Sequence, residues 1–210
     1  MIPNDRMRAA ELACRCVLRL GRSTLPVDPY TMLRYSRGVY LYPLDELPGR
    51  ILSEGRDALQ PLRSGKVAAV SFSTDPDHCV ICYQPEAYPP RLLFSMAHEL
   101  GHLVLRHRGG PSARASTQER MADLFASCLL MPPPLLSLLA REHGGLYAEQ
   151  LAGVFGVSPL AAFYAASNAA IPLREETRLA IEQLLLETAR RRFPTRVSGR
   201  WHPMPPMAQP

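Results

Sequence analysis

Apolar residues recur at helical spacing in several segments of this 210-residue chain. In residues 7–20 they fall on one side of a helix, and a glycine follows as its stop. Asp28 and Pro29 then predict the start of a short helix through Tyr35, because Asp caps a helix and Pro fits its first position. The same spacing recurs in three later segments: residues 92–105, 117–129 and 173–192. We therefore expect a mostly helical protein.

Three short segments are instead rich in the β-branched and aromatic residues that are typical of strands. They are residues 39–42, 67–72 and 79–83, and a polar turn joins the last two. The pattern predicts an α+β fold, in which a small antiparallel sheet precedes the apolar segment 92–105.

Composition sets the broad class of the protein. With 47% hydrophobic residues, the chain can bury one substantial core. Its first residues lack the apolar core of a signal peptide, and three prolines interrupt the apolar run that begins at residue 128. We therefore expect a soluble, cytoplasmic protein with no membrane segment. The odd number of five cysteines fits reduced thiols better than a disulfide framework.

The net charge of +5 is confined to the end of the chain. Residues 189–210 contain five arginines and no acidic residue, so the preceding 188 residues are neutral overall. The basic charge therefore does not mark the folded body as a nucleic-acid binder. Five of the 21 prolines lie in the same segment, and we expect residues 195–210 to form a disordered, basic, Pro-rich tail.

The segment 92–105 contains the motif His98-Glu99-Leu100-Gly101-His102. Two histidines four residues apart on a helix point the same way and can bind one metal ion, for which zinc is the first candidate. Glu99 is turned away from the ligand direction and would be the general base for an attacking water molecule. The alternative is a buried helix whose polar residues are satisfied by their neighbours, although burial of such groups without a metal is costly.

A catalytic zinc ion needs a third protein ligand. In the helix predicted from residue 117, Glu119 and Asp123 are four residues apart and share one face. Glu119 could bind the metal while Asp123 hydrogen-bonds the outer nitrogen of a ligand histidine. A solvated acidic pair is the alternative. His107 is the rival third ligand, but its spacing from His102 differs from the metzincin pattern, so we favour Glu119.

Taken together, these motifs resemble the ImmA/IrrE family of metallo-endopeptidases. The resemblance rests on residues 91–107, on the helical segment 119–126 and on Leu129-Leu130-Met131-Pro132, which follow the order and spacing of the family signature. Asp123 stands where the family usually has Asn. The resemblance implies a zincin-like fold of the gluzincin kind and peptide-bond hydrolysis at one Zn²⁺.

The family also suggests a partner and a domain plan. Its members cut repressor proteins of the helix-turn-helix type, often encoded beside them, so the resemblance implies such a substrate and the derepression of mobile-element or stress genes. We expect a metallopeptidase domain in residues 1–144, a helix-turn-helix-like subdomain in 145–170 and a C-terminal helix in 171–194. Four side chains are candidates for contacts with substrate or oxyanion: Tyr83, Tyr88, Arg91 and His107.

Two further patterns have both a functional and a structural interpretation. Residues 147–168 fit a helix-turn-helix, but the segment 159–167 has no Arg, Lys, Asn or Gln to read base edges, so we do not expect DNA binding. Cys79 and Cys82, preceded by His78, could be mistaken for half of a metal site. Residues three apart on a strand face opposite sides, however, so we expect two structural thiols.

A function of another class remains as the alternative. The chain could be a non-catalytic transcriptional or toxin-antitoxin interaction module, with a vestigial or structural zinc site and with residues 147–168 and the tail as its binding elements. A Glu99→Gln variant separates the two hypotheses, because a protease would lose cleavage while a binding module would be unaffected.

Overall fold

The computed structural model describes residues 3–75, 77–107 and 113–193. The chain divides into two compact units. The sheet unit comprises the described residues from 28 to 122, and the helical unit comprises those from 3 to 27 and from 123 to 193. The domain boundaries expected at residues 144, 170 and 194 were defined by function and not by packing, so they stay predictions. The tail expected at residues 195–210 lies outside the described residues.

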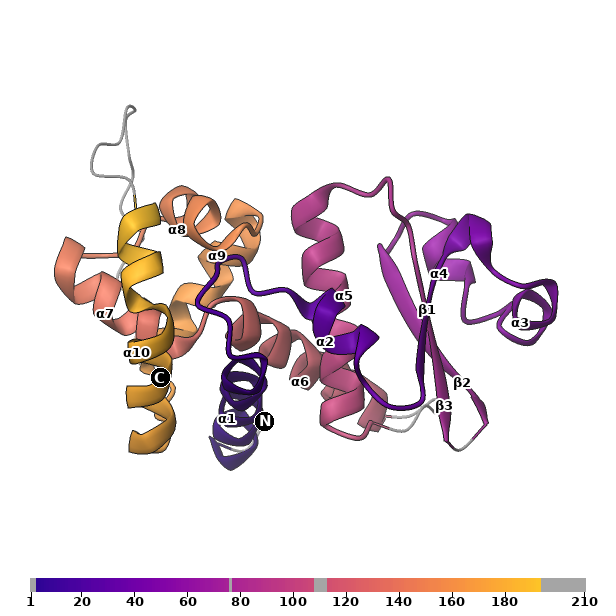
Figure 1. The fold of residues 1–210 in the computed structure, drawn as a ribbon, viewed down its shortest axis with the longest axis horizontal. Helices are drawn as coiled ribbons and strands as arrows, with labels where there is room; N and C mark the ends of the chain where they lie inside the picture. Colours follow the sequence, from indigo (N-terminus) through magenta and orange to yellow (C-terminus); the bar gives the residue numbers. More distant parts are fainter. Residues whose placement is uncertain (1–2, 76, 108–112, 194–210) are drawn as a thin grey trace. The chain divides into compact units, whose positions relative to one another are not determined.

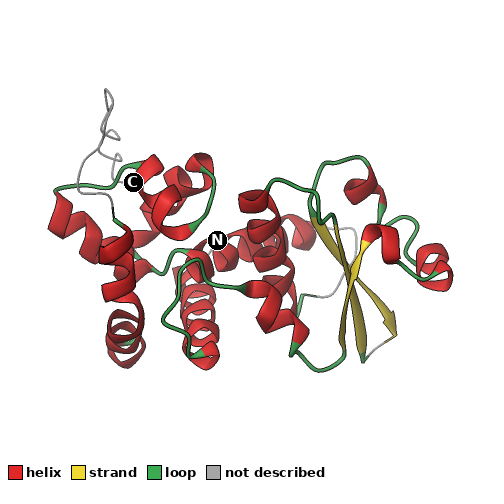
Figure 2. Ribbon diagram, turned by 45° about the horizontal axis from the view of Figure 1, so that its top comes forward, coloured by secondary structure: helices red, strands yellow, loops and turns green. Residues whose placement is uncertain are grey.

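A three-stranded sheet in the order β1-β3-β2 forms one layer of the sheet unit (Figure 2). β2 (Ala69–Asp75) and β3 (His78–Tyr83) are antiparallel, as expected, whereas β1 (Val39–Pro43) pairs with β3 in parallel. The sheet is therefore mixed and not purely antiparallel. A parallel pair requires a crossover connection. The crossover from β1 contains three short helices that the sequence analysis did not predict: η1 (Leu44–Glu46), α3 (Gly49–Glu54) and α4 (Gln60–Arg63).

Two helices pack together in the sheet unit. α2 (Pro29–Arg34) begins as predicted, since the side chain of Asp28 accepts a hydrogen bond from the Thr31 backbone N–H at 3.2 Å. α5 (Pro89–Val104) carries the His-Glu motif and packs against both α2 and β2 (Figure 1). One side of α5 is buried, and this determines which way the helix faces. Its buried residues are Met96, Ala97, Glu99, Leu100 and Gly101.

The helical unit contains the first and the last helix of the described chain, α1 (Pro3–Leu20) and α10 (Glu175–Arg192). The apolar periodicity predicted both of them. α6 (Ala113–Leu130) begins in the sheet unit and ends in the helical unit, where its apolar side chains enter the core. The largest fully buried side chains of this unit are Phe125, Phe155, Leu129, Leu130, Met131, Leu135, Leu136 and Leu139. In the part of the chain that the structure describes, no single helix is long and apolar enough to cross a membrane, and two bent helix pairs meet that test only when each pair is combined.

The prolines at positions 132–134 separate two helices and begin the second of them. α7 (Pro133–His143) has two prolines in its first turn, where the missing N–H has no intrahelical partner to lose. In the sequence these prolines indicate only an interruption of the apolar run, so α7 was not predicted. Gly144, with φ 71°, ends the helix in the left-handed conformation.

α8 (Ala148–Phe155) and α9 (Pro159–Ala165) form the expected helix-turn-helix-like element. α8 and the segment Pro159–Ala170, which includes η2 (Ala166–Ala170), are bent by 106° at the turn, an angle typical of this motif. The turn requires Gly156, because its φ is 68° and an added Cβ would lie 2.4 Å from Pro26 Cγ. The Ser158 hydroxyl caps α9 by accepting a hydrogen bond from Ala161 N at 3.1 Å.

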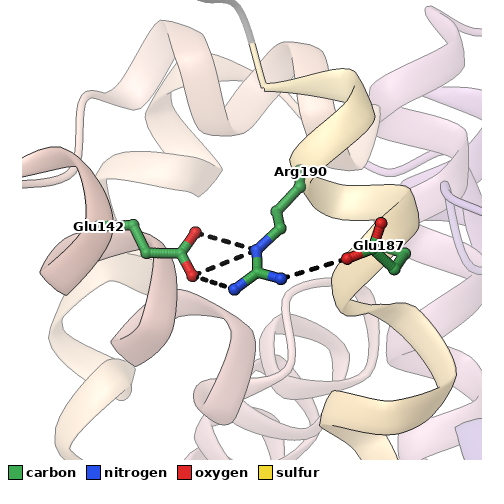
Figure 3. A network of polar contacts seen from close by, with 3 residues as sticks. All are labelled: Glu142, Glu187 and Arg190. Carbon is green, nitrogen blue, oxygen red and sulfur yellow. Dashed lines mark hydrogen bonds and ion pairs between the residues drawn. The ribbon is translucent and has the colours of Figure 1, made fainter.

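An ion-pair network links α7 to α10 within the helical unit (Figure 3). The Arg190 guanidinium donates to both carboxylate oxygens of Glu142 on α7, with its Nε 3.2 Å from each. It also reaches Glu187, one turn earlier on α10, at 3.2 Å. The guanidinium lowers the pKa of Glu142, so this contact favours the charged carboxylate.

Candidate metal centre

The two histidines of the motif occupy successive turns of α5, and their Nε2 atoms approach each other. His98 Nε2 and His102 Nε2 are 2.9 Å apart, and the two ring centroids are separated by 4.7 Å. Only 17% of the His98 side chain and 19% of the His102 side chain are exposed. The i, i+4 spacing thus places two nitrogen donors side by side in a largely buried position.

α6 supplies the third donor of this cluster. Glu119 Oε2 lies 3.2 Å from His98 Nε2, and Glu119 Oε1 lies 3.5 Å from His102 Nε2. The Glu119 side chain is 57% exposed, so the cluster is open to solvent on the side of this carboxylate. Among residues 3–75, 77–107 and 113–193, this is the group of three that the structure brings together as potential metal ligands.

The geometry of the cluster fits a small divalent metal ion. Bonds of about 2.1 Å in a tetrahedral arrangement set ligand atoms roughly 3.4 Å apart. The two histidine nitrogens are 2.9 Å apart, and the nearest carboxylate oxygen of Glu119 lies 3.2 Å from His98 and the other oxygen 3.5 Å from His102. With one ligand atom taken from each residue, all three lie within 4.8 Å of one another, which is close enough for them to bind one ion after small side-chain adjustments. Two imidazole nitrogens and one carboxylate oxygen also form a donor set found in catalytic zinc sites, which leave one position open.

Glu99, between the two histidines, is buried with 8% of its surface exposed. The hydroxyl of Ser71 on β2 donates a hydrogen bond to Glu99 Oε2. Burial raises the pKa of Glu99, while the Ser71 hydrogen bond and the neighbouring His98 oppose that rise. The carboxylate is therefore held in a defined position by a group from the sheet.

Sequence reasoning did not single out Ser71. Its signal is weak, since it is a hydroxyl residue within the otherwise apolar stretch 67–72. β2 pairs Ser71 with the fully buried Ile81 on β3. The sequence does not show which face of the sheet Ser71 occupies. Nor does it show that α5 packs on that face, because both depend on tertiary structure.

His107 lies beside the cluster and contacts the nitrogen of His102 that points away from Glu119. Its Nδ1 is 3.1 Å from His102 Nδ1, with the two ring planes nearly perpendicular at 77°. Burial lowers the pKa of His107, and the Glu119 carboxylate acts in the opposite direction. His107 is not part of the group of potential ligands formed by His98, His102 and Glu119.

Asp123 follows Glu119 by one turn of α6 and is exposed. Its expected hydrogen bond to a ligand histidine stays a prediction. The same holds for the three remaining candidates for substrate or oxyanion contacts. Arg91 donates to the carbonyl oxygens of Gly65 and Lys66, at 2.6 Å each, and so ties the start of α5 to the chain before β2.

The two tyrosine candidates lie at the ends of elements near α5. The ring of Tyr83, in the last position of β3, meets Tyr30 of α2 edge to face with centroids 5.9 Å apart. Burial, together with a hydrogen bond to Tyr30, raises the pKa of Tyr83 to about 12, which favours the neutral phenol. Tyr88 immediately precedes α5 and is 63% exposed.

The cysteines of β3 do not form a metal site in the described structure. Cys79 and Cys82 lie at opposite ends of a strand segment, and neither belongs to the group of potential ligands. Burial raises the pKa of each thiol to about 11, so both are predominantly neutral near neutral pH. All five cysteines of the chain are free thiols.

Comparison with known proteins places this site in a family. The model of the family described as IrrE N-terminal-like domain matches residues 58–167, which are 110 of the 210 residues. The chain is also similar to the radiation response metalloprotease IrrE of Deinococcus radiodurans, with 31% identity over 103 residues. That match covers 43% of this chain and 31% of the relative, so this chain spans less than a third of that protein's length. The matched residues include His98, Glu99, His102 and Glu119, and the chain therefore belongs to the IrrE N-terminal-like domain family.

Proposed function

We propose that this protein is a zinc-dependent endopeptidase. The observation that carries the proposal is the convergence of His98, His102 and Glu119 to within 3.5 Å of one another, with the buried Glu99 on the intervening turn of α5. A metal centre alone would require only the ligands. The additional carboxylate, which a hydroxyl holds in place, is what peptide hydrolysis requires.

The donor set favours zinc over other common ions. Imidazole suits zinc and several transition metals, whereas magnesium and calcium prefer sites made of oxygen donors alone. When bound, zinc supplies Lewis acidity, which polarises the scissile carbonyl and lowers the pKa of water. His98 and His102 would hold the ion through Nε2, and Glu119 would hold it through its carboxylate.

Glu99 is the general base in this proposal. Its carboxylate accepts a proton from the attacking water, whose oxygen bonds to the carbonyl carbon of the substrate. Glu99 then passes the proton to the amine nitrogen as the peptide C–N bond breaks. Ser71 holds Oε2 of Glu99 by donating a hydrogen bond, which leaves Oε1 as the oxygen that takes part in proton transfer.

We further propose a helix-turn-helix repressor as the substrate and the cytoplasm as the site of action. The resemblance to a family that cuts such repressors supports the substrate, and cleavage would derepress the genes that the repressor controls. The relative in Deinococcus radiodurans is described as a radiation response metalloprotease, which supports proteolysis as the activity.

The test is to incubate the zinc-loaded protein with a helix-turn-helix repressor from the same genome and to measure intact masses. We expect two fragments whose masses add up to the substrate plus one water. Removal of the metal with a chelator should stop cleavage, and added zinc should restore it. Fragments formed equally well by the chelated protein would refute metal-dependent hydrolysis, and an uncut repressor would refute the proposed substrate.

A non-catalytic interaction module is the second candidate function. The observation that favours it is the exposure of three large apolar residues on α9: Leu160, Phe163 and Tyr164, at 65%, 44% and 67%. Such an apolar helix face suits protein binding better than DNA binding, because it has no basic side chain for phosphates or bases. In that case a Glu99→Gln variant would behave like the parent in every assay.

A further inference from the structure

The C-terminal end of α5 brings His107 to His102 through a specific turn. The Arg106 N–H donates to Leu103 O at 3.1 Å, and the His107 N–H donates to His102 O at 2.9 Å. These two bonds, with a left-handed residue between helix and loop, define a Schellman motif. Arg106 is that left-handed residue, with φ 56°. The residue after it, here His107, characteristically packs on the residue five positions earlier, which is His102.

This packing is unusual in its chemistry. The contact that accompanies a Schellman motif is commonly hydrophobic. Here it joins two imidazoles through Nδ1 atoms 3.1 Å apart, which is hydrogen-bond distance. A non-glycine residue also occupies the left-handed position, where glycine would be free of strain. The helix end is therefore built around a polar contact with one of the two histidines of the cluster.

The hydrogen bond has one consistent arrangement of protons. His102 directs Nε2 toward Glu119 and His98, so Nε2 must keep its lone pair when it serves as a metal ligand. The single proton of the neutral His102 ring then resides on Nδ1, which donates to His107 Nδ1. His107 must accept this bond, and its own proton accordingly lies on Nε2.

We propose that His107 is a positioning residue for His102, which fixes the orientation and tautomer of that ligand and is not itself a ligand. The inference rests on the proposed metal centre. An acceptor on the outer nitrogen orients the ring of a ligand histidine and makes its ligating nitrogen more basic, and loss of such an acceptor typically weakens metal binding about 10–100-fold. Two distances carry the proposal: His107 Nδ1 lies 3.1 Å from Nδ1 of His102, whereas Glu119 lies 3.5 Å from Nε2 of the same ring. His107 and Glu119 therefore contact different nitrogens of His102.

Three variants separate the hydrogen bond from simple packing. His107→Phe keeps an aromatic ring on His102 but has no acceptor, so zinc affinity should fall about 10–100-fold. His107→Asn offers a carbonyl oxygen close to the position of Nδ1 and should recover most of that loss. Arg106→Gly keeps the left-handed φ without strain and is the matched control, with affinity expected to equal that of the parent.

Zinc affinity is measured on the metal-free full chain by competition with a chromophoric chelator. Long-range ¹H–¹⁵N spectra of the zinc-loaded parent should also show His107 protonated on Nε2, a readout that requires no variant to fold. The proposal is overturned if His107→Phe binds zinc as tightly as the parent, if His107→Asn binds no better than His107→Phe, or if His107 is protonated on Nδ1. A parent protein that binds no zinc would instead refute the proposed function, so the two failures are distinguishable.

Discussion

Replacement of Glu119 by Ala tests the assignment of the third ligand. The carboxylate faces both histidines, with one oxygen 3.2 Å from His98 Nε2 and the other 3.5 Å from His102 Nε2. The binding free energy of a structural zinc site with four protein ligands is about 10–16 kcal/mol, which is roughly 2.5–4 kcal/mol for each ligand. Because about 1.4 kcal/mol corresponds to a factor of ten, we expect Glu119→Ala to weaken zinc binding by about 100–1000-fold.

The structure also explains why folding should survive this change. The Glu119 side chain is 57% exposed, so its removal leaves no buried cavity. The thermal unfolding of the metal-free protein should therefore match that of the parent, which separates loss of affinity from loss of fold. Glu149→Ala, on an exposed residue in the first turn of α8, is the matched control and should bind zinc like the parent.

Chelator competition on metal-free protein gives the dissociation constants of both variants. The assignment of Glu119 as the third ligand is refuted if Glu119→Ala retains the zinc affinity of the parent. It is also refuted if His107→Ala loses zinc more completely than Glu119→Ala, because His107 would then be the third ligand.

Three further outcomes follow from individual contacts. Ser71→Ala removes a hydrogen bond to the buried Glu99 carboxylate, so cleavage should slow by about 10–100-fold while zinc affinity stays unchanged, as kcat and chelator competition would show. Asp123→Ala should weaken zinc binding by about 10–100-fold if this residue holds a ligand histidine, and an unchanged affinity would remove it from the site. Glu142→Gln should lower the melting temperature near about pH 7, because Arg190 holds the pKa of Glu142 below its ordinary value. A carboxyl group whose pKa is lowered by folding contributes stability above its unfolded pKa, and that contribution is lost as pH falls through the folded pKa. The difference in melting temperature should therefore shrink as the pH is lowered, and a difference that stays constant or grows on acidification would contradict this.

Much of the candidate site could be predicted from the sequence because its parts depend on local geometry. The four-residue spacing of His98 and His102 places both rings on one side of α5 in any regular helix. The position of Glu119 on a second helix also follows from apolar periodicity. Its approach to the histidines requires packing between helices, which periodicity does not specify. The need of a catalytic zinc ion for a third protein ligand predicted it instead.

The features that the sequence did not predict depend on distant pairing or on an unusual backbone conformation. The parallel pairing of β1 with β3 joins residues about forty positions apart, and no local pattern specifies it. The contact of Ser71 with Glu99 likewise requires α5 to pack on β2. The contact of His107 with His102 depends on a left-handed Arg106, where the sequence has no glycine to signal the turn.

The central claim is that this site hydrolyses peptide bonds and that Glu99 is its base. The most direct measurement compares protein amino termini, by mass spectrometry, in cells that express either the parent chain or Glu99→Gln. Both proteins should contain equal amounts of zinc, since Glu99 is not one of the three potential ligands. We expect at least one new amino terminus with the parent and none with Glu99→Gln. Identical sets of termini from two zinc-loaded proteins would contradict the account.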